Sequence, residues 1–444
     1  MLHQPGARGP TPRRARPRLT AEPVTLPAQH LTYCTNIHPG ETWAEVRANL
    51  ARYVVPVRER FAGGAAGGAP FGVGLRLSAE AAAALAQPAA LDELRAFLAD
   101  QGLYVFTVNG FPYGTFHGAP VKARVYRPDW LEPERLAYTN RLADLLAALL
   151  PEGVEGTVST LPGAFAPRAR GPGSRARIAR AVAEHAAHLV ALERRTGRRV
   201  ALAVEPEPCC LLESVADAVA FFTDHVFAPA TIAAVAAGAG LGRPAAERAL
   251  RERVGLCYDT CHMAVAFEEP AAALAALAGA GVRVPKVQVS AGLRVRFARP
   301  DDPVLEALAG FADPVYLHQV VEQQPGGGAL VRYLDLGDAL AAAARGPARP
   351  REWRVHFHVP LFREQLGPFE STRAHAAELL RLPGEAGRRP HVEVETYSWD
   401  VLPEEYRRED VTAAIARELA WTAAHLADAA AHGRTVLSPS RAGS

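Results

Sequence analysis

Short apolar segments that alternate with longer amphipathic stretches constrain the fold of this chain more than any other feature. Residues 132–150 and 176–195 carry apolar residues at helical spacing, and similar stretches separate most of the apolar segments. Repeated strand–helix units of this kind build a parallel sheet. Eight parallel strands close a (β/α)8 TIM barrel, so the sequence predicts this α/β fold. The eight predicted strands are 31–36, 71–77, 103–109, 156–160, 199–205, 254–259, 284–290 and 391–397.

A long interruption precedes the last predicted strand. Residues 291–350 hold two strand-like segments, 315–322 and 329–336, on either side of a glycine-rich turn at 326–328, and this pattern predicts an inserted hairpin. A ninth strand is predicted at 354–359. Two interpretations remain open: the insertion carries an extra strand, or the preceding barrel strand is misassigned.

The two ends of the chain differ from its middle. With 444 residues and 49% hydrophobic content the chain is long enough for one large core, which we place at residues 29–432. Residues 1–28 mix arginines with Pro, Gly and Ala and have no apolar periodicity. Residues 433–444 form a short Ser-containing tail. Both ends are predicted to be disordered.

Composition bears on the compartment and on the kind of partner. No long apolar run follows the basic amino end or occurs elsewhere, which argues against a signal peptide and against membrane insertion. The five cysteines lack the spacing of a disulfide framework. Basic and acidic residues are interspersed, with a net charge of +2, instead of forming a phosphate-binding stripe. We expect a cytoplasmic protein that binds a small-molecule metabolite and no nucleic acid.

Several predicted strands end in carboxylates. Glu205 stops one strand at a proline, and Asp259 ends another with His262 three residues later. Glu393 and Glu395 share one face of the last strand, and Glu395 lies nearer its carboxyl end. Because the carboxyl ends of barrel strands meet at one mouth, these side chains can converge on a metal ion. The alternative is that Asp259 only caps the helix that follows it.

Histidines and amides provide further candidates. His356 and His358 share a face of the predicted strand at 354–359, which favours metal ligation by at least one of them, and His318 in the predicted hairpin is a weaker candidate. Other polar residues follow strand ends within pairs such as Asn109-Gly110, which are also ordinary turn formers. The residues that we expect to contact a substrate are His38, Asn109, His117, Gln288, His318 and His356.

The order of these motifs resembles a known superfamily. Glu205, Asp259-Thr-Cys-His262 and Glu395 resemble the xylose-isomerase-like TIM-barrel superfamily of sugar isomerases, epimerases and endonuclease IV-type DNA-repair enzymes. Within it, segments 31–40, 356–360 and 393–399 resemble the EboE-type metabolite traffic proteins. This resemblance implies handling or export of a secondary-metabolite precursor, and a functional link to a UbiA-like membrane protein encoded in the same bacterial gene cluster.

The chain departs from the endonuclease pattern at several strand ends. The third and fourth predicted strands end without the histidines that a three-zinc cluster needs, and Gln288 stands where a histidine is expected on the seventh. The sequence therefore argues against a three-metal cluster and against DNA repair, and it leaves open whether one or two ions bind, with one ion favoured.

The resemblance, joined to residue chemistry, implies a metal-dependent isomerase or epimerase. One divalent ion, Mn²⁺ or Mg²⁺ in preference to Zn²⁺, is expected to bind Glu205, Asp259, His358 and Glu395. The ion would polarise a sugar-like or hydroxycarbonyl substrate, Glu205 and Glu395 would transfer the proton, and His262 would hold a substrate oxygen. The alternatives are a non-catalytic metabolite carrier with the same barrel and a metal-dependent hydrolase.

Overall fold

Eight parallel strands close into a barrel in the computed structural model, which describes residues 29–65, 69–118, 120–324, 327–382 and 389–436. The strand order is β1-β14-β7-β6-β5-β4-β3-β2, and a parallel bridge between Cys34 and Gly74 joins the two ends of this sheet. The strands are β1 (Leu31–Tyr33), β2 (Phe71–Arg76), β3 (Leu103–Asn109), β4 (Gly156–Thr160), β5 (Val200–Val204), β6 (Val254–Asp259), β7 (Lys286–Val289) and β14 (His391–Val394).

The predicted TIM barrel and its eight strands are confirmed. Strands β3, β4 and β6 begin and end where the sequence predicted, and the other five are shorter. Every residue of β2 through β6 is buried, because helices cover the outer face of the barrel and side chains fill its interior. Strands of this kind read as continuous apolar runs, which is why the sequence located them.

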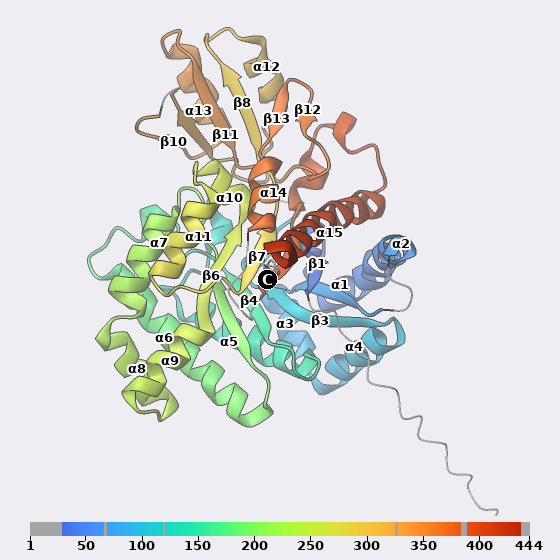
Figure 1. Ribbon diagram of the computed structural model, residues 1–444, viewed down its shortest axis with the longest axis vertical. Coiled ribbons are helices and arrows are strands. Elements are labelled where there is room, and N and C mark those ends of the chain that lie inside the picture. The colour runs from blue at the N-terminus through green and yellow to red at the C-terminus, as the bar shows by residue number, and fades with distance from the viewer. Residues whose placement is uncertain (1–28, 66–68, 119, 325–326, 383–388, 437–444) are drawn as a thin grey trace, which may run out of the picture.

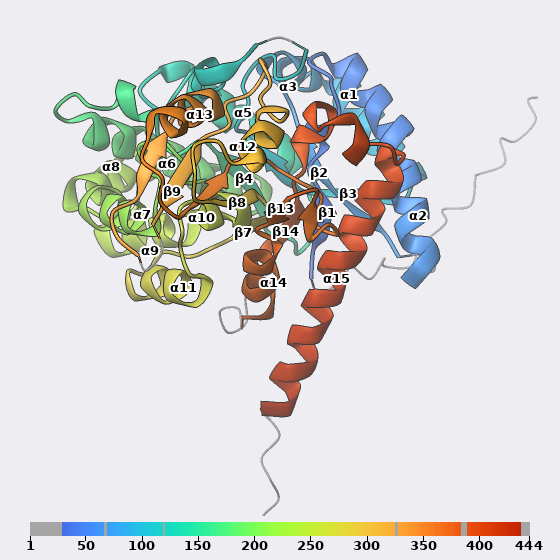
Figure 2. The ribbon, with the colours of Figure 1, turned by 90° about the horizontal axis from the view of Figure 1, so that it is seen from above.

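Helices surround the barrel on the outside (Figure 1). They are α1 (Trp43–Asn49), α2 (Val55–Ala65), α3 (Ala79–Leu85), α4 (Pro88–Asp100), α5 (Pro133–Leu149), α6 (Ser174–Thr196), α7 (Val215–Phe221), α8 (Pro229–Ala239), α9 (Arg243–Arg253), α10 (Thr260–Val265), α11 (Pro270–Gly279), α14 (Arg373–Arg381) and α15 (Val411–Val436). The last of these runs outward past the barrel in Figure 2. Of the helices in the described ranges, no single one is long and apolar enough to cross a membrane, whereas Val215–Val226 and Pro229–Ala239, bent by 60°, meet that requirement together.

A second sheet is inserted between β7 and β14 and lies at one end of the barrel (Figure 1). Its order is β10-β9-β11-β8-β13-β12 and all its pairings are antiparallel. The strands are β8 (Leu293–Phe297), β9 (Val320–Gln323), β10 (Val331–Tyr333), β11 (Arg351–Val355), β12 (Gln365–Leu366) and β13 (Phe369–Ser371), with helices α12 (Pro303–Ala309) and α13 (Leu336–Arg345).

This inserted sheet is larger than the sequence predicted. The predicted hairpin exists as β9 and β10, but the sheet continues past residue 350 to Ser371. The ninth strand, predicted at 354–359, is β11, which starts at Arg351 and ends at Val355, so the prediction that His356 and His358 lie on a strand is wrong. It pairs with β8 and β9 and lies outside the barrel. The extra strand therefore belongs to the insertion, and the barrel strand before it was assigned correctly.

The predicted chain ends fall largely outside the described residues. Residues 1–28 and 437–444 are not among them, and the segment predicted as a tail begins inside α15, which continues to Val436.

Candidate functional site

Carboxylates from three barrel strands meet at one mouth of the barrel. Glu205 directly follows β5, Asp259 is the last residue of β6, and Glu395 directly follows β14. All three side chains are buried, and one oxygen from each lies within 4.8 Å of the other two. This convergence follows from the parallel barrel, in which neighbouring strands end on the same side.

Asp259 caps the helix that follows it and keeps one carboxylate oxygen free of that cap. Its Oδ1 accepts hydrogen bonds from the backbone N–H of Cys261 (2.7 Å) and of His262 (3.0 Å), which caps α10, and from the hydroxyl of Ser290 (2.7 Å). Its Oδ2 is buried without a hydrogen-bond partner among the described residues. Burial acts to raise the pKa of Asp259, but His262, His358 and these hydrogen bonds lower it below its usual value. The carboxylate is therefore charged and has one oxygen free for a ligand.

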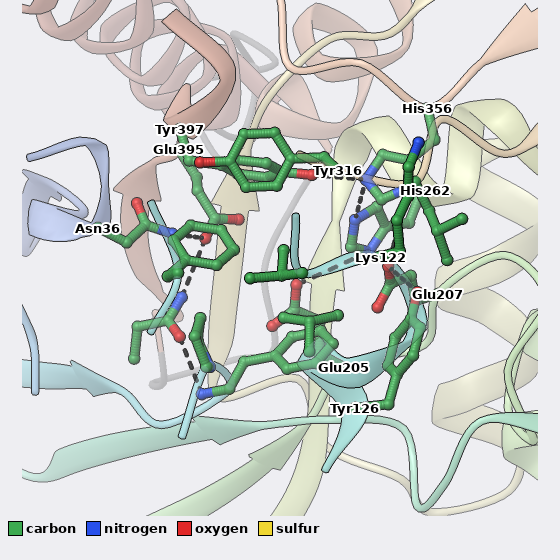
Figure 3. Close-up of a pocket in the computed structure, with 17 residues that line it drawn as sticks. Asn36, Lys122, Tyr126, Glu205, Glu207, His262, Tyr316, His356, Glu395 and Tyr397 are labelled. Atoms are coloured by element: carbon green, nitrogen blue, oxygen red, sulfur yellow. Dashed lines mark hydrogen bonds and ion pairs between the residues drawn. The ribbon is translucent and has the colours of Figure 1, made fainter. Parts of the chain in front are cut away.

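Glu395 is held by two amides. Its Oε1 accepts a hydrogen bond from Nδ2 of Asn36 (2.6 Å; Figure 3) and another from Nδ2 of Asn109 (3.0 Å). Burial, followed by the nearby carboxylates, raises the pKa values of both Glu395 and Glu205 well above the usual range. Both groups therefore hold a proton more readily than an exposed glutamate does, which is a property that general acid–base catalysis uses.

Three imidazoles converge beside the carboxylates. Nε2 of His356 lies 3.0 Å from Nε2 of His262 and 3.2 Å from Nε2 of His358. Each Nδ1 donates its proton to a carbonyl oxygen: that of Pro206 for His262 (2.9 Å), of the Gln319 side chain for His356 (2.7 Å) and of the Glu395 backbone for His358 (2.7 Å). These hydrogen bonds occupy Nδ1 of each ring, so any nitrogen lone pair that a ring has lies on Nε2, and the three Nε2 atoms point toward one another.

Such a convergence of lone pairs is repulsive unless a cation lies between them. A proton is not that cation for His356 and His358, because burial and the neighbouring histidines lower the pKa of His356 well below its usual value, and burial lowers the pKa of His358 to about 4. Neutral imidazoles fixed by a carbonyl on the far nitrogen have the form that metal-binding histidines take.

Glu207 joins the histidines and was not among the sequence-predicted site residues. Its Oε1 accepts a hydrogen bond from the hydroxyl of Tyr126 (2.7 Å), which in turn accepts one from Nε2 of Gln319 (2.8 Å). Burial raises the pKa of Glu207 to about 6. The only sequence signal for it was its position two residues after Glu205 in the Glu-Pro-Glu-Pro segment that ends at residue 208.

The donor atoms fit a divalent metal ion. One oxygen each of Glu205, Glu207 and Asp259 is buried without a hydrogen-bond partner among the described residues, which is costly for a carboxylate unless a cation lies beside it. The possible ligands form overlapping groups in which the atoms lie within 4.8 Å: Glu205, Asp259 and Glu395; Asp259, His262 and His358; Glu207, His262 and His356; and Cys261, His356 and His358.

The predicted ligand set is divided between two of these groups. Glu205, Asp259 and Glu395 form one group, whereas His358 shares the next with Asp259 and His262. The sequence argued for one ion because the third and fourth strands lack histidines. In the structure, histidines that directly follow β11 of the insertion lie beside the carboxylates instead, and Asp259 links the two groups.

The predicted substrate-contacting residues separate into two sets. Asn109 and His356 line the pocket above the carboxylates. His38 stacks on Tyr53 at 4.0 Å, and His318 stacks on Phe357 at 4.1 Å. Both stack inside the protein, outside the pocket lining, because each is buried against an aromatic ring.

Two further predicted residues also lie outside the pocket lining. Gln288 is buried and accepts a hydrogen bond from the thiol of Cys257 (2.8 Å). His117 lies behind Phe116, with the two rings edge to face at 4.9 Å, and its pKa is lowered to about 3, first by burial. Gln288 and His117 therefore contact other side chains, and neither of them lines the pocket.

Structures that align with this chain have low sequence identity to it, and neither a family model nor a curated protein matches it significantly. A xylose isomerase-like TIM barrel protein from Mycobacterium smegmatis in complex with magnesium has 16% identity and a TM-score of 0.47, with 90% of this chain and 98% of that chain covered. The IOLI protein with a binding zinc atom has 13% identity and a TM-score of 0.42, with 90% of this chain and 98% of that chain covered. A xylose isomerase domain protein from Alicyclobacillus acidocaldarius has 14% identity and a TM-score of 0.43, with 90% of this chain and 99% of that chain covered. The barrel assignment rests on the strand order and register described above.

Proposed function

We propose that this protein is a divalent-metal-dependent isomerase or epimerase that acts on a hydroxycarbonyl compound. The observation that carries this proposal is the buried group of Glu205, Asp259 and Glu395 beside three histidine Nε2 atoms, at the mouth of a barrel pocket. Barrels of this architecture place their chemistry at this mouth, although the fold alone does not select a reaction.

The metal would be held by Glu205, Asp259 and Glu395, together with His358, which shares the next group of possible ligands with Asp259. The carboxylate group suits Mn²⁺ or Mg²⁺, and the imidazole group suits Zn²⁺. When bound, a divalent ion withdraws electrons from a substrate carbonyl and makes the neighbouring C–H more acidic.

The side chains of the chain itself then move the proton. Glu205 and Glu395 both line the pocket, and their raised pKa values suit one carboxylate to remove a proton and the other carboxyl group to return it. Asn36 and Asn109 fix the orientation of Glu395. His262 would accept a hydrogen bond from a substrate hydroxyl at Nε2, because its Nδ1 is committed to the carbonyl of Pro206.

The test combines metal content with proton exchange. The purified protein would be supplied in turn with Mn²⁺, Mg²⁺ and Zn²⁺ and analysed for bound metal, beside an Asp259→Asn, Glu395→Gln double variant. A Glu404→Gln variant, which changes an exposed carboxylate, is the control. Exchange of the C–H next to the carbonyl is followed by NMR in deuterium oxide with dihydroxyacetone and 2-hydroxyacetophenone as probes.

We expect at least one equivalent of metal in the parent and in Glu404→Gln, a loss of metal in the double variant, and exchange that requires the metal. Metal binding without exchange would refute the isomerase and favour the metabolite carrier. If no metal binds, the metal-dependent proposal fails, and with it the hydrolase alternative.

We also propose the finer assignment that the sequence motifs imply. The protein would act as an EboE-type metabolite traffic protein in the cytoplasm, handling a small-molecule secondary-metabolite precursor for a UbiA-like membrane partner. The motifs at residues 31–40, 356–360 and 393–399 support this role. Co-purification of the two tagged proteins from membranes tests the partner, and a failure to co-purify after crosslinking would count against it.

A further inference from the structure

The pocket is lined by polar side chains and by a larger set of apolar and aromatic ones. Besides carboxylates, amides, histidines and Lys122, the lining residues are aromatic or aliphatic: Phe111, Pro112, Phe116, Val121, Val125, Tyr126, Tyr316, Leu317 and Tyr397. The pocket has a cavity volume of about 50 Å³ and opens to solvent, so a ligand larger than a few water molecules extends toward its open side. A ligand in the pocket therefore meets aromatic rings next to polar groups, since Tyr316 and Tyr397 lie between Glu395 and His356 (Figure 3).

Three aromatic rings of the lining form a cluster, although they come from separate parts of the chain. The rings of Phe116, Tyr316 and Tyr397 contact one another, with centroids 5.2 Å apart for the two pairs that include Phe116 and 5.3 Å apart for the third. They come from the loop after β3, from the insertion and from the segment after β14. The backbone N–H of Val121 donates to the carbonyl of Val315 (2.9 Å), which ties the insertion to the β3 loop.

The described side chains that line the pocket offer no unpaired cation for a phosphate. Among the described residues that line it, Lys122 is the only lysine or arginine. Its ammonium donates to the carboxylate of Asp335 (2.6 Å) and to the carbonyl of Asp313 (3.0 Å), so its charge is already paired. Three of the lining residues are glutamates, Glu205, Glu207 and Glu395, which disfavour an anion further.

Resting on the proposed function, we propose that the substrate is an uncharged hydroxycarbonyl compound with an aromatic body, and not a sugar phosphate. The hydroxycarbonyl head reaches the carboxylates and histidines, and the aromatic body contacts Phe116, Tyr316 and Tyr397. Offset or edge-to-face contacts with these rings favour a flat aromatic group over a hydrated sugar chain.

Three probes that share one head group test this inference. The first, 2-hydroxyacetophenone, carries an aromatic group. The second, dihydroxyacetone, has no such group, and the third, dihydroxyacetone phosphate, carries a charged phosphate. Calorimetric titration into the Mn²⁺-supplied full-length protein measures their dissociation constants. We expect 2-hydroxyacetophenone to bind about 10- to 100-fold more tightly than either of the others, because it buries a phenyl ring.

Two matched tyrosine variants test whether the preference for the aromatic probe comes from the aromatic side chains of the pocket. Tyr316→Ala should reduce the preference for 2-hydroxyacetophenone at least about fivefold and leave dihydroxyacetone binding unchanged. Tyr333→Ala changes another tyrosine of the insertion, which packs on Trp353 outside the pocket lining, and should leave all three constants unchanged.

The inference is overturned if dihydroxyacetone phosphate binds as tightly as 2-hydroxyacetophenone, if none of the probes binds, or if Tyr333→Ala has the same effect as Tyr316→Ala. These results are independent of turnover. A preference for the aromatic probe without proton exchange would support the pocket assignment while refuting the isomerase.

Discussion

Glu418 of α15 provides a test of how burial raises the pKa of a carboxyl group next to the candidate site. Its side chain is buried, and Oε1 accepts hydrogen bonds from the backbone N–H of Leu361 (3.0 Å) and the hydroxyl of Thr396 (2.8 Å). Leu361 lies three residues after His358, and Thr396 directly follows Glu395. Burial raises the pKa of Glu418 from 4.5 to about 7, although both hydrogen bonds act to lower it.

The direction of the pH effect follows from this raised pKa. Between pH 4.5 and about 7 the folded protein keeps the Glu418 proton while the unfolded chain releases it. The stabilising contribution is therefore complete below pH 4.5 and is lost as pH rises through about 7. The pKa difference corresponds to about 3 kcal/mol in the free energy of unfolding.

Urea unfolding of the parent and of Glu418→Gln, followed by circular dichroism from pH 4 to pH 8, measures this contribution. Glutamine keeps an acceptor oxygen for both hydrogen bonds and does not titrate. We expect the parent to lose about 3 kcal/mol relative to the variant across this range. The exposed Glu404→Gln substitution should show no such trend. A difference that stays within about 1 kcal/mol, or that grows in favour of the parent as pH rises, would refute the argument.

Two further predictions concern the interior of the barrel. Lys286→Met removes the partner 2.6 Å from the buried Glu393 carboxylate and should lower the free energy of unfolding by about 3–5 kcal/mol, whereas a Lys286→Met, Glu393→Met double variant should recover most of the loss in urea unfolding. An equal loss in both would contradict this. Gly74→Ala should cost about 1–3 kcal/mol in the same assay, because its Cβ would lie 2.0 Å from Glu393 Oε1 and 2.7 Å from the Tyr33 carbonyl oxygen, while Gly337→Ala in open space on α13 should cost nothing. Equal effects of the two alanines would show that the close approach is not the cause.

The barrel could be predicted from the sequence because its signals are local. A parallel strand covered on both sides reads as an apolar run, and the amphipathic stretch after it reads as a helix, whatever the rest of the chain does. The inserted sheet could be predicted only as a hairpin. Strand β8 pairs with β11 and β13, which lie more than 50 residues away along the chain, and no local pattern encodes that pairing.

The strand-end rule also selected the carboxylates at the mouth, Glu205, Asp259 and Glu395. It did not identify Glu207, whose hydrogen bond comes from the distant Tyr126. Nor did it show that three histidine Nε2 atoms converge, since that depends on where the insertion returns to the barrel.

Glu393 and Glu395 show most clearly how far the sequence alone can predict the position of a side chain. The sequence determined that the two share one face of the last strand, because side chains two apart on a strand point the same way. Only the tertiary structure decided that Glu393 pairs with Lys286 in the barrel interior, while Glu395 lies beside Asn36 and Asn109 and close to the carboxylates of Glu205 and Asp259. The period of a strand is fixed by its own backbone, whereas the partner of each side chain depends on the neighbouring strands and on the loops beyond the strand ends.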